Sequence, residues 1–421
     1  MTTGSAGPSR PPGSARVSRR GLLIAGAAGG VALAVTSLPA RARADEQRLH
    51  DIGSLAGSGA PSEATDLNDR GDVVGATSLP DSELSHAFVM NPRVGSGRLL
   101  DLTPSQERNT RAQAVNRYGV VAGTLGMGVT PSATAATGSG TAAALREPTL
   151  SPLPHSPIGT AAASDNEPQR PFVWRPDTGL EVLPLPPGTY GAQVSDIDDH
   201  GTVLVVGTND VPDPNVPGAN YPVGSFLWDP ARRKYTALTV PDPSIPGIVP
   251  LANKLTARGG VAGGVIHPLD EKAWQHTPVV WEPGSLTPRP LSTAGASDAF
   301  ATAGNSRGLL TGWRMDAPGG MSNAVYWPDP AADPVVLGGR VAFDVNDRGQ
   351  IAGVRDLPNS PDFPFTSVLW EPDSRRTTPL GDFGLGSYVY AVNAAGRSAG
   401  YAVAAGDTPH NTAVWWEAVR R

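Results

Sequence analysis

The stretch Asp66-Leu67-Asn68-Asp69-Arg70-Gly71-Asp72-Val73-Val74-Gly75 returns six more times along the chain in weaker form. In each copy, a polar segment that ends in glycine lies between two apolar runs. Six of the seven copies carry Asn or Asp three residues before that glycine, and Thr256 is the exception. Such a side chain bonds its own backbone and glycine accepts a left-handed φ, so each copy predicts a tight β-hairpin. The seven glycines are Gly71, Gly119, Gly201, Gly259, Gly308, Gly349 and Gly396.

A second phrase follows each hairpin and consists of two apolar residues and then tryptophan, except that the first copy ends in Met90. A short apolar strand closes most units, so each unit supplies about four strands. The first glycines are spaced by 48, 82, 58, 49, 41 and 47 residues. Propeller blades repeat at about 40–50 residues. We therefore predict an all-β protein, a seven-bladed β-propeller of four-stranded blades with the tryptophans packed between blades. The tryptophans are Trp174, Trp228, Trp281, Trp327, Trp370 and Trp416.

The two ends of the repeat region predict how the ring closes. The last unit stops at Trp416-Glu417-Ala418-Val419-Arg420-Arg421 and lacks its final strand. An isolated strand of the missing type, residues 49–55, precedes the first unit. We expect this N-terminal strand to complete the seventh blade, which makes the first strand of each unit the innermost one. Six or eight blades, or an open solenoid, are the alternatives.

The two phrases resemble the repeats of the extracellular HAF-repeat family, which is named for the tripeptide that stands at His86-Ala87-Phe88. The family pattern is roughly Asn-Asp-x-Gly-x-Val-x-Gly, then His-Ala-Phe-Leu-Trp, then Leu-Gly-x-Leu-Gly. The similarity covers about residues 49–417, and the histidine of the pattern remains only at His86. The resemblance implies a propeller-like bacterial protein that is exported. It implies no particular activity.

The first 44 residues have the features of an export signal. Arg19 and Arg20 precede a weakly apolar stretch that runs from Leu22 to Leu38, and Ala42-Arg43-Ala44 is a small-x-small cleavage site. The paired arginines are typical of the twin-arginine route. We therefore expect residues 1–44 to be a cleaved signal peptide and residues 45–421 to be a single secreted propeller domain. Retention of the apolar stretch as a membrane anchor is the alternative.

Composition and charge narrow the choice of partners. The chain has 421 residues, of which 50 are glycine and 43 are proline, and it has no cysteine, so disulfides and thiol chemistry are excluded. The net charge is −6, and removal of the six arginines in residues 1–44 leaves −12. Such an acidic chain has no basic surface for nucleic acid or for anionic membranes. We expect a monomer without a cofactor.

The insertions in the repeat predict where a ligand binds. Each unit has a second glycine after the turn, which is Gly75 in the first copy. From this glycine to the Trp or Met of the same unit the spacing varies from 15 to 51 residues, whereas the Asn turn keeps its length. The long loops therefore join the second and third strands on one face, which we call the long-loop face, and loops on a rigid scaffold often bind ligands. The longest insertion, at about residues 126–169, is expected to be flexible. Candidate binding residues on this face are Trp274, Tyr190, Tyr221, Tyr388, His276, Phe383 and Tyr390.

Asp66, Asp196 and Asp344 occupy equivalent positions two residues before the turn, where they would face or flank the centre of the ring. They are weak candidates for a cation site with oxygen ligands, and hydrogen bonding to the turn backbone is the simpler interpretation. We identify no catalytic residues and no cofactor, because no known catalytic motif is present and the seven histidines are scattered.

The sequence thus favours a secreted, non-catalytic β-propeller that binds an extracellular glycan or protein on its long-loop face. One alternative is a polysaccharide hydrolase or lyase that uses loop carboxylates and histidines such as Glu271 and His276. A structural protein of the cell envelope is the other.

Overall fold

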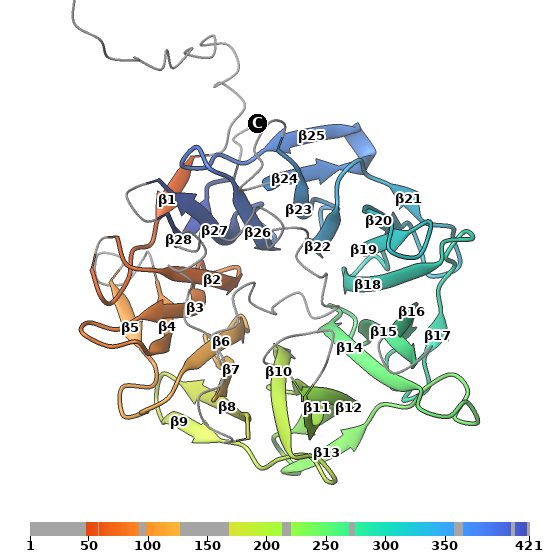
Figure 1. Ribbon diagram of the computed structural model, residues 1–421, viewed down its shortest axis with the longest axis horizontal. Coiled ribbons are helices and arrows are strands. Elements are labelled where there is room, and N and C mark those ends of the chain that lie inside the picture. The colour runs from red at the N-terminus through yellow and green to blue at the C-terminus, as the bar shows by residue number, and fades with distance from the viewer. Residues whose placement is uncertain are drawn as a thin grey trace, which may run out of the picture. The chain divides into compact units, whose positions relative to one another are not determined.

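The computed structural model describes residues 48–57, 59–91, 98–126, 168–212, 220–268, 274–357, 365–405 and 409–418. These residues form seven four-stranded antiparallel sheets that stand around a common centre as the blades of a propeller (Figure 1). The ring lies within the compact unit Arg43–Arg421. The expected export residues Arg19, Arg20, Ala42 and Ala44, and residues 127–167 of the expected insertion, lie outside the described residues.

Each blade begins with its innermost strand and proceeds outward. The innermost strands are β2 (Ser62–Leu67), β6 (Thr110–Val115), β10 (Gly191–Ile197), β14 (Val249–Leu255), β18 (Asp298–Gly304), β22 (Val341–Val345) and β26 (Ser387–Val392). The second strands are β3 (Val73–Ser78), β7 (Val121–Leu125), β11 (Val203–Pro212), β15 (Val261–Pro268), β19 (Leu310–Met315), β23 (Ile351–Asp356) and β27 (Ser398–Ala404).

The third strands are β4 (Ser85–Met90), β8 (Arg170–Arg175), β12 (Asn220–Asp229), β16 (Trp274–Trp281), β20 (Ser322–Trp327), β24 (Phe365–Glu371) and β28 (His410–Trp416). The outermost strands are β5 (Leu99–Asp101), β9 (Gly179–Val182), β13 (Lys234–Ala237), β17 (Arg289–Pro290), β21 (Val335–Val336), β25 (Arg376–Pro379) and β1 (Leu49–Asp51). A 3₁₀ turn, η3 (Pro372–Ser374), joins β24 to β25. No helix in the described residues has the length and hydropathy needed to cross a membrane.

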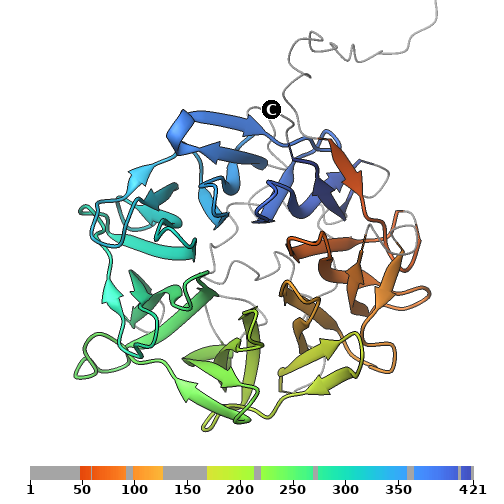
Figure 2. The same cartoon turned by 180° about the vertical axis from the view of Figure 1, so that it is seen from behind.

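The expected closure is confirmed. Strand β1 pairs antiparallel with β28, so the outermost strand of blade 7 comes from the other end of the chain (Figure 2). The backbone N–H of Ile52 donates to the carbonyl of Ala413, and that of Glu417 donates to the carbonyl of Arg48. The His50 ring also stacks on Trp415, with centroids 4.0 Å apart. The two ends of the repeat region are therefore held by backbone pairing and by ring stacking.

The Asn turns fold as the sequence predicts. In blade 1, the N–H of Gly71 donates to the carbonyl of Asn68, and the Asn68 side-chain oxygen accepts the N–H groups of Arg70 and Asp72. Gly71 has a φ of 86°, and the first glycine of every other blade also has a positive φ. A side chain is strained in this conformation, which explains why the glycine recurs.

The amide nitrogen of each turn asparagine bonds the next blade, which the sequence did not indicate. It donates to the carbonyl of the equivalent residue in that blade, and the last blade donates to the first. The pairs are Asn68 to Asn116 (2.8 Å), Asn116 to Asp198 (3.0 Å), Asn305 to Asn346 (3.0 Å), Asn346 to Asn393 (2.8 Å) and Asn393 to Asn68 (3.0 Å). Asp198 and Thr256 have no side-chain amide, so this chain of bonds is interrupted at blades 3 and 4.

Each innermost strand contains a β-bulge at the same place, as the register shift between Ala64 and Asp66 shows in blade 1. The second glycine of the repeat lies opposite this bulge. A Cβ at Gly75 would lie 1.9 Å from the carbonyl oxygen of Glu63, and one at Gly312 would lie 1.9 Å from that of Phe300. The backbone itself therefore excludes a side chain here. In blade 3 the equivalent residue is Val205, so a blade can also form without this glycine.

The tryptophans pack between blades, as predicted. Trp281, Trp327 and Trp416 are fully buried, and each belongs to an apolar cluster that includes residues of the preceding blade. Their ring nitrogens donate to the carbonyls of Thr239, Ser292 and Gly381, which lie on the connections that lead into their own blades. Each of these tryptophans thus fills an inter-blade space and holds a connecting segment.

We predict that Asn393→Asp destabilises the closed ring. The new carboxylate keeps the oxygen that accepts the turn N–H groups of Ala395 and Arg397 but loses the donor to Asn68. Loss of one buried hydrogen bond costs about 1–3 kcal/mol, so thermal unfolding should begin at a lower temperature. Asp198→Asn is the matched reverse variant, because it adds an amide where blade 3 lacks one, and it should leave the stability equal or higher. Identical melting of Asn393→Asp and wild type would show that the bridge is dispensable.

Candidate functional site

Four charged residues gather at the axis of the ring and form what we call the axial cluster: Asp66, Asp196, Lys254 and Asp344. Each follows the bulge of its innermost strand, and alanine takes this place in the other three blades. The Lys254 ammonium Nζ lies 3.0 Å from Asp344 Oδ1, although the two residues belong to blades 4 and 6. Lys254 therefore provides a positive charge among three carboxylates.

Each carboxylate of the axial cluster also bonds the innermost strand of the next blade. Asp66 Oδ2 accepts the N–H of Val115 at 2.9 Å, Asp196 Oδ2 that of Leu255 at 2.8 Å, and Asp344 Oδ2 that of Val392 at 2.8 Å. The simpler sequence interpretation named the turn backbone as the partner of these aspartates. The bonded groups, however, are those of the neighbouring blade and not of the turn itself.

Burial shifts the protonation of the axial cluster. It raises the pKa of Asp66 to about 6 and that of Asp196 to about 7, although the charge of Lys254 lowers both. Burial also acts to lower the pKa of Lys254, but the charges of Asp344, Asp66 and Asp196 together hold that pKa above its ordinary value. The described residues contain no group of three acidic or histidine side chains placed to hold a metal ion. Within the axial cluster, the ammonium of Lys254 is the cation.

A second buried charged group joins blades 1, 2 and 7. Arg111 Nη2 lies 3.0 Å from Glu63 Oε1, and only 1% of Arg111 is exposed. Tyr390 is buried beside them, and burial, followed by the charge of Glu63, holds the pKa of its phenol well above the usual range. The sequence repeat gave no signal for this pair, because the other blades carry different residue types at the equivalent positions. Tyr390, a candidate for the long-loop face, therefore has a place in the interior.

Two of the candidate binding residues meet on the long-loop face. The rings of Tyr221 on β12 and Trp274 on β16 lie 5.0 Å apart and are tilted by 44°, and both are half-buried. Trp274 also packs against the apolar cluster that contains Ile266. Tyr190 is 37% exposed, and its N–H donates to Thr208, which pairs with Pro222 beside Tyr221. We call Tyr190, Tyr221 and Trp274 the aromatic patch of blades 3 and 4.

Among the remaining candidates, Phe383 is 38% exposed, whereas Tyr388 and His276 pack against neighbouring side chains. Tyr388 is half-buried and stacks on Tyr401, with centroids 5.1 Å apart. His276 is only 8% exposed, and its Nδ1 lies 3.0 Å from Asp298 Oδ1. Its backbone N–H donates to the same carboxylate at 2.7 Å, so His276 ties blade 4 to blade 5. Glu271, the proposed partner of His276 in a hydrolase, lies outside the described residues.

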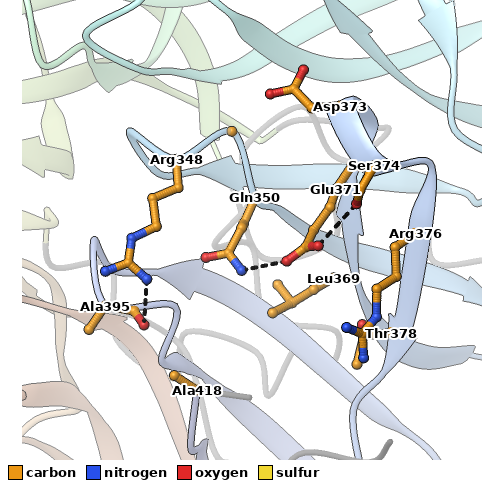
Figure 3. Close-up of a pocket in the computed structure, with 11 residues that line it drawn as sticks. Arg348, Gln350, Leu369, Glu371, Asp373, Ser374, Arg376, Thr378, Ala395 and Ala418 are labelled. Carbon is orange, nitrogen blue, oxygen red and sulfur yellow. Dashed lines mark hydrogen bonds between the residues drawn. The ribbon is translucent and has the colours of Figure 1, made fainter. Parts of the chain in front are cut away.

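A cavity of about 610 Å³ lies between blades 6 and 7 on the face that carries the Asn turns, opposite the long-loop face (Figure 3). We call this the turn face. Gln350 Nε2 donates to Glu371 Oε1 at 2.9 Å, and Ser374 donates to Glu371 Oε2 at 3.1 Å. The sequence did not indicate this cavity. Its lining residues are Arg348, Gly349, Gln350, Leu369, Glu371, Asp373, Ser374, Arg376, Thr378, Ala395 and Ala418.

Comparisons with known proteins agree on the fold. No family model and no curated protein sequence matches the chain. A solved structure of a prolyl endopeptidase is similar to this chain, with a TM-score of 0.50 and 12% sequence identity. The match covers 84% of this chain and 50% of the endopeptidase chain. The propeller domain of the Trilobed protease from Pyrococcus furiosus matches 86% of this chain and 97% of its own length, with a TM-score of 0.47 and 7% identity.

TolB from Acinetobacter baumannii matches 76% of this chain and 63% of its own length, with a TM-score of 0.42 and 10% identity. The chain thus spans half of the prolyl endopeptidase chain and less than two thirds of the TolB chain. At such identities the likeness concerns architecture alone. The protein is a seven-bladed β-propeller, and its activity has to be argued from its own residues.

We predict that Lys254→Met destabilises the protein more at pH 8 than at pH 5. At pH 8, above the pKa values of about 6 and 7 of Asp66 and Asp196, these carboxylates are ionised in the wild type, and removal of the Lys254 ammonium should cost about 3 kcal/mol as for a broken buried ion pair. At pH 5, Asp66 and Asp196 are largely protonated, because their folded-state pKa values of about 6 and 7 lie above the ordinary 3.8. Thermal melting at both pH values measures the difference.

The same pKa values also give the direction in which the stability of the wild type changes with pH. A raised folded-state pKa means that the folded protein holds protons that the unfolded chain releases, so this contribution is present near pH 4 and is lost as the pH rises through 6 and 7. The control variant is Lys234→Met, which removes an exposed lysine from β13 and should melt like the wild type at both pH values. Equal losses for Lys254→Met at pH 5 and pH 8 would contradict the assigned role of Lys254.

Proposed function

We propose that the protein is an exported, non-catalytic β-propeller that binds an extracellular glycan at the aromatic patch of blades 3 and 4. The observation that carries this proposal is the ring pair formed by Tyr221 and Trp274. The two side chains come from different blades, so their spacing is fixed by the packing of the ring rather than by one loop. Both flank the segments that join second and third strands, on the face where the insertions gather.

The chemistry of the patch fits a sugar. Aromatic rings present a flat apolar face, and tyrosine and tryptophan also carry a polar group at the edge. A pyranose ring has the complementary character, with C–H groups on its faces and hydroxyls around its rim. Tyr190 adds an exposed ring on the same blade as Tyr221. A glycan chain could therefore contact three rings without a rearrangement of the scaffold.

The hydrolase alternative receives less support from these residues. A general base has to reach the substrate or its attacking water, but His276 is buried and its carboxylate partner holds it against blade 5. The accessible side chains therefore fit a role in glycan binding better than a role in hydrolysis. Kinship to the extracellular HAF-repeat family, and export by the twin-arginine route, remain parts of this proposal that rest on the sequence.

The binding proposal predicts that Trp274→Ala abolishes retention on immobilised polysaccharides. The substitution removes one of the two paired rings, and stacking of a base on one aromatic ring, a comparable contact, contributes about 1–3 kcal/mol. A glycan array and polysaccharide pull-down with residues 45–421 would measure the loss. Tyr118→Ala is the matched control, because Tyr118 is 55% exposed on an Asn turn of the opposite face.

Two results would refute this assignment. Retention of Trp274→Ala equal to that of the wild type would separate glycan binding from the patch. Absence of any retained glycan in the wild type would point instead to a protein ligand or to a structural role in the envelope.

Export has its own test. We expect the double variant Arg19→Lys, Arg20→Lys to remain in the cytoplasm, because lysine keeps the charge but not the planar guanidinium geometry. Fractionation of cells that produce wild type and variant would show the difference. A variant that carries Arg41→Lys and Arg43→Lys changes the same number of arginines outside the pair and should still be exported. Equal export of both variants would remove the twin-arginine assignment.

A further inference from the structure

The cavity between blades 6 and 7 exists because of how the ring closes. In blades 2 to 6 a hairpin joins the third and fourth strands on the turn face. Strands β28 and β1 of blade 7 belong to opposite ends of the chain, so no such hairpin joins them. Ala418, the last described residue after β28, lies on the wall of the cavity.

The junction between blades 2 and 3 shows what normally fills this space. There Arg233, on the hairpin of blade 3, reaches Glu181 on the outermost strand of blade 2, with Nη1 2.7 Å from Oε1. Glu181 pairs with Val173, and in blade 6 the equivalent pair is Thr378 and Leu369. Both of these lie in the lining of the cavity (Figure 3). The cavity thus occupies the position that a neighbouring hairpin takes elsewhere in the ring.

The charges around the cavity differ from those of an equivalent junction. In blade 1, Arg70 Nε lies 3.4 Å from its own counter-ion, Asp72, and Nη1 donates to Tyr118 at 3.2 Å. In blade 6 the residue equivalent to Asp72 is Gln350, and its amide donates to Glu371. Within the described residues, Arg348 has no ion pair and makes one long hydrogen bond, 3.5 Å, to the carbonyl of Ala395. The guanidinium of Arg348 is therefore free to bind an anion.

We propose that this cavity binds a small hydroxylated carboxylate, such as a sugar acid, whose carboxylate group pairs with Arg348. Arginine binds carboxylates through paired N–H groups, and the contact is stronger than one between neutral groups. Thr378 supplies a neutral hydrogen-bonding group for a hydroxyl, whereas Gln350 and Ser374 already donate to Glu371. None of the described lining residues carries an aromatic ring for a nucleobase. A volume of about 610 Å³ lies in the range of small-molecule sites.

This site is separate from the aromatic patch, since the two lie on opposite faces of the ring. The inference therefore does not rest on the proposed function. The two assignments can be separated by variants, because Trp274→Ala changes only the long-loop face and Arg348→Gln changes only the cavity.

Titration calorimetry on the full-length chain tests the proposal with glucuronate and galacturonate as probes and with glucose and galactose as neutral counterparts. We expect saturable binding of the acids and at least tenfold weaker binding of the neutral sugars. Arg348→Gln should weaken the binding of the acids by about tenfold, as loss of one charge-assisted contact implies. Ala418→Trp should block the cavity by bulk while leaving every lining charge in place.

Arg70→Gln is the matched control, because it makes the same change at the equivalent position of blade 1, and it should bind the acids like the wild type. Trp274→Ala should also bind them unchanged. The proposal fails if the acids do not bind saturably, if neutral sugars bind equally well, or if Arg348→Gln binds like the wild type. It also fails if binding appears only after deletion of residues 419–421, since the cavity would then belong to the end of the chain itself.

Discussion

The side-chain amide of the turn asparagine combines two functions that a carboxylate cannot combine. Its oxygen accepts N–H groups of its own turn, and its nitrogen donates to the turn of the next blade, as in Asn346 and Asn393. Because Asn393 donates to Asn68, the last repeat is bonded to the first in the same way as neighbouring repeats are bonded to each other. In five of the seven blades, the turn and the bond to the next blade thus depend on one residue type. Asp198 retains the first function only, which shows that a closed ring tolerates an interruption.

Blades are joined at three distances from the axis, and each distance uses a different kind of interaction. Near the axis, carboxylates of the axial cluster accept N–H groups of the next innermost strand, and Lys254 partly balances their charge. Around the turns, the asparagine amides bond neutral carbonyls. Farther out, buried tryptophans such as Trp281 and Trp327 fill the space between sheets. In the axial cluster burial raises the pKa of Asp66 and of Asp196, so we expect this layer to contribute to the pH dependence of stability.

The sequence predicted the features that depend on neighbours in the chain or that repeat. The positive φ of Gly71, the order of the strands and the pairing of residues 49–51 with the last unit all follow from local turn chemistry and from the count of strands. The bulge escaped prediction because no residue type in the innermost strands marks its position. The contact of Lys254 with Asp344 spans two blades, which no spacing in the sequence can show. From the insertions, the sequence predicted a ligand site on the long-loop face, where the aromatic patch lies. It did not indicate the cavity, which lies on the opposite face.

A repeat protein makes its exceptions visible, since each position has six counterparts for comparison. Lys254 stands where the other blades have aspartate or alanine, and the result is a cation at the axis. Among the seven equivalent positions only blade 1 has an acid, Asp72, which pairs with Arg70, whereas Arg348 is followed by Gln350. Blade 7 differs from the other blades in topology, because no hairpin joins its third and fourth strands. This difference leaves a space beside Arg348. A ring that is held together at several junctions can accept such a departure at one of them, because the other junctions maintain the scaffold.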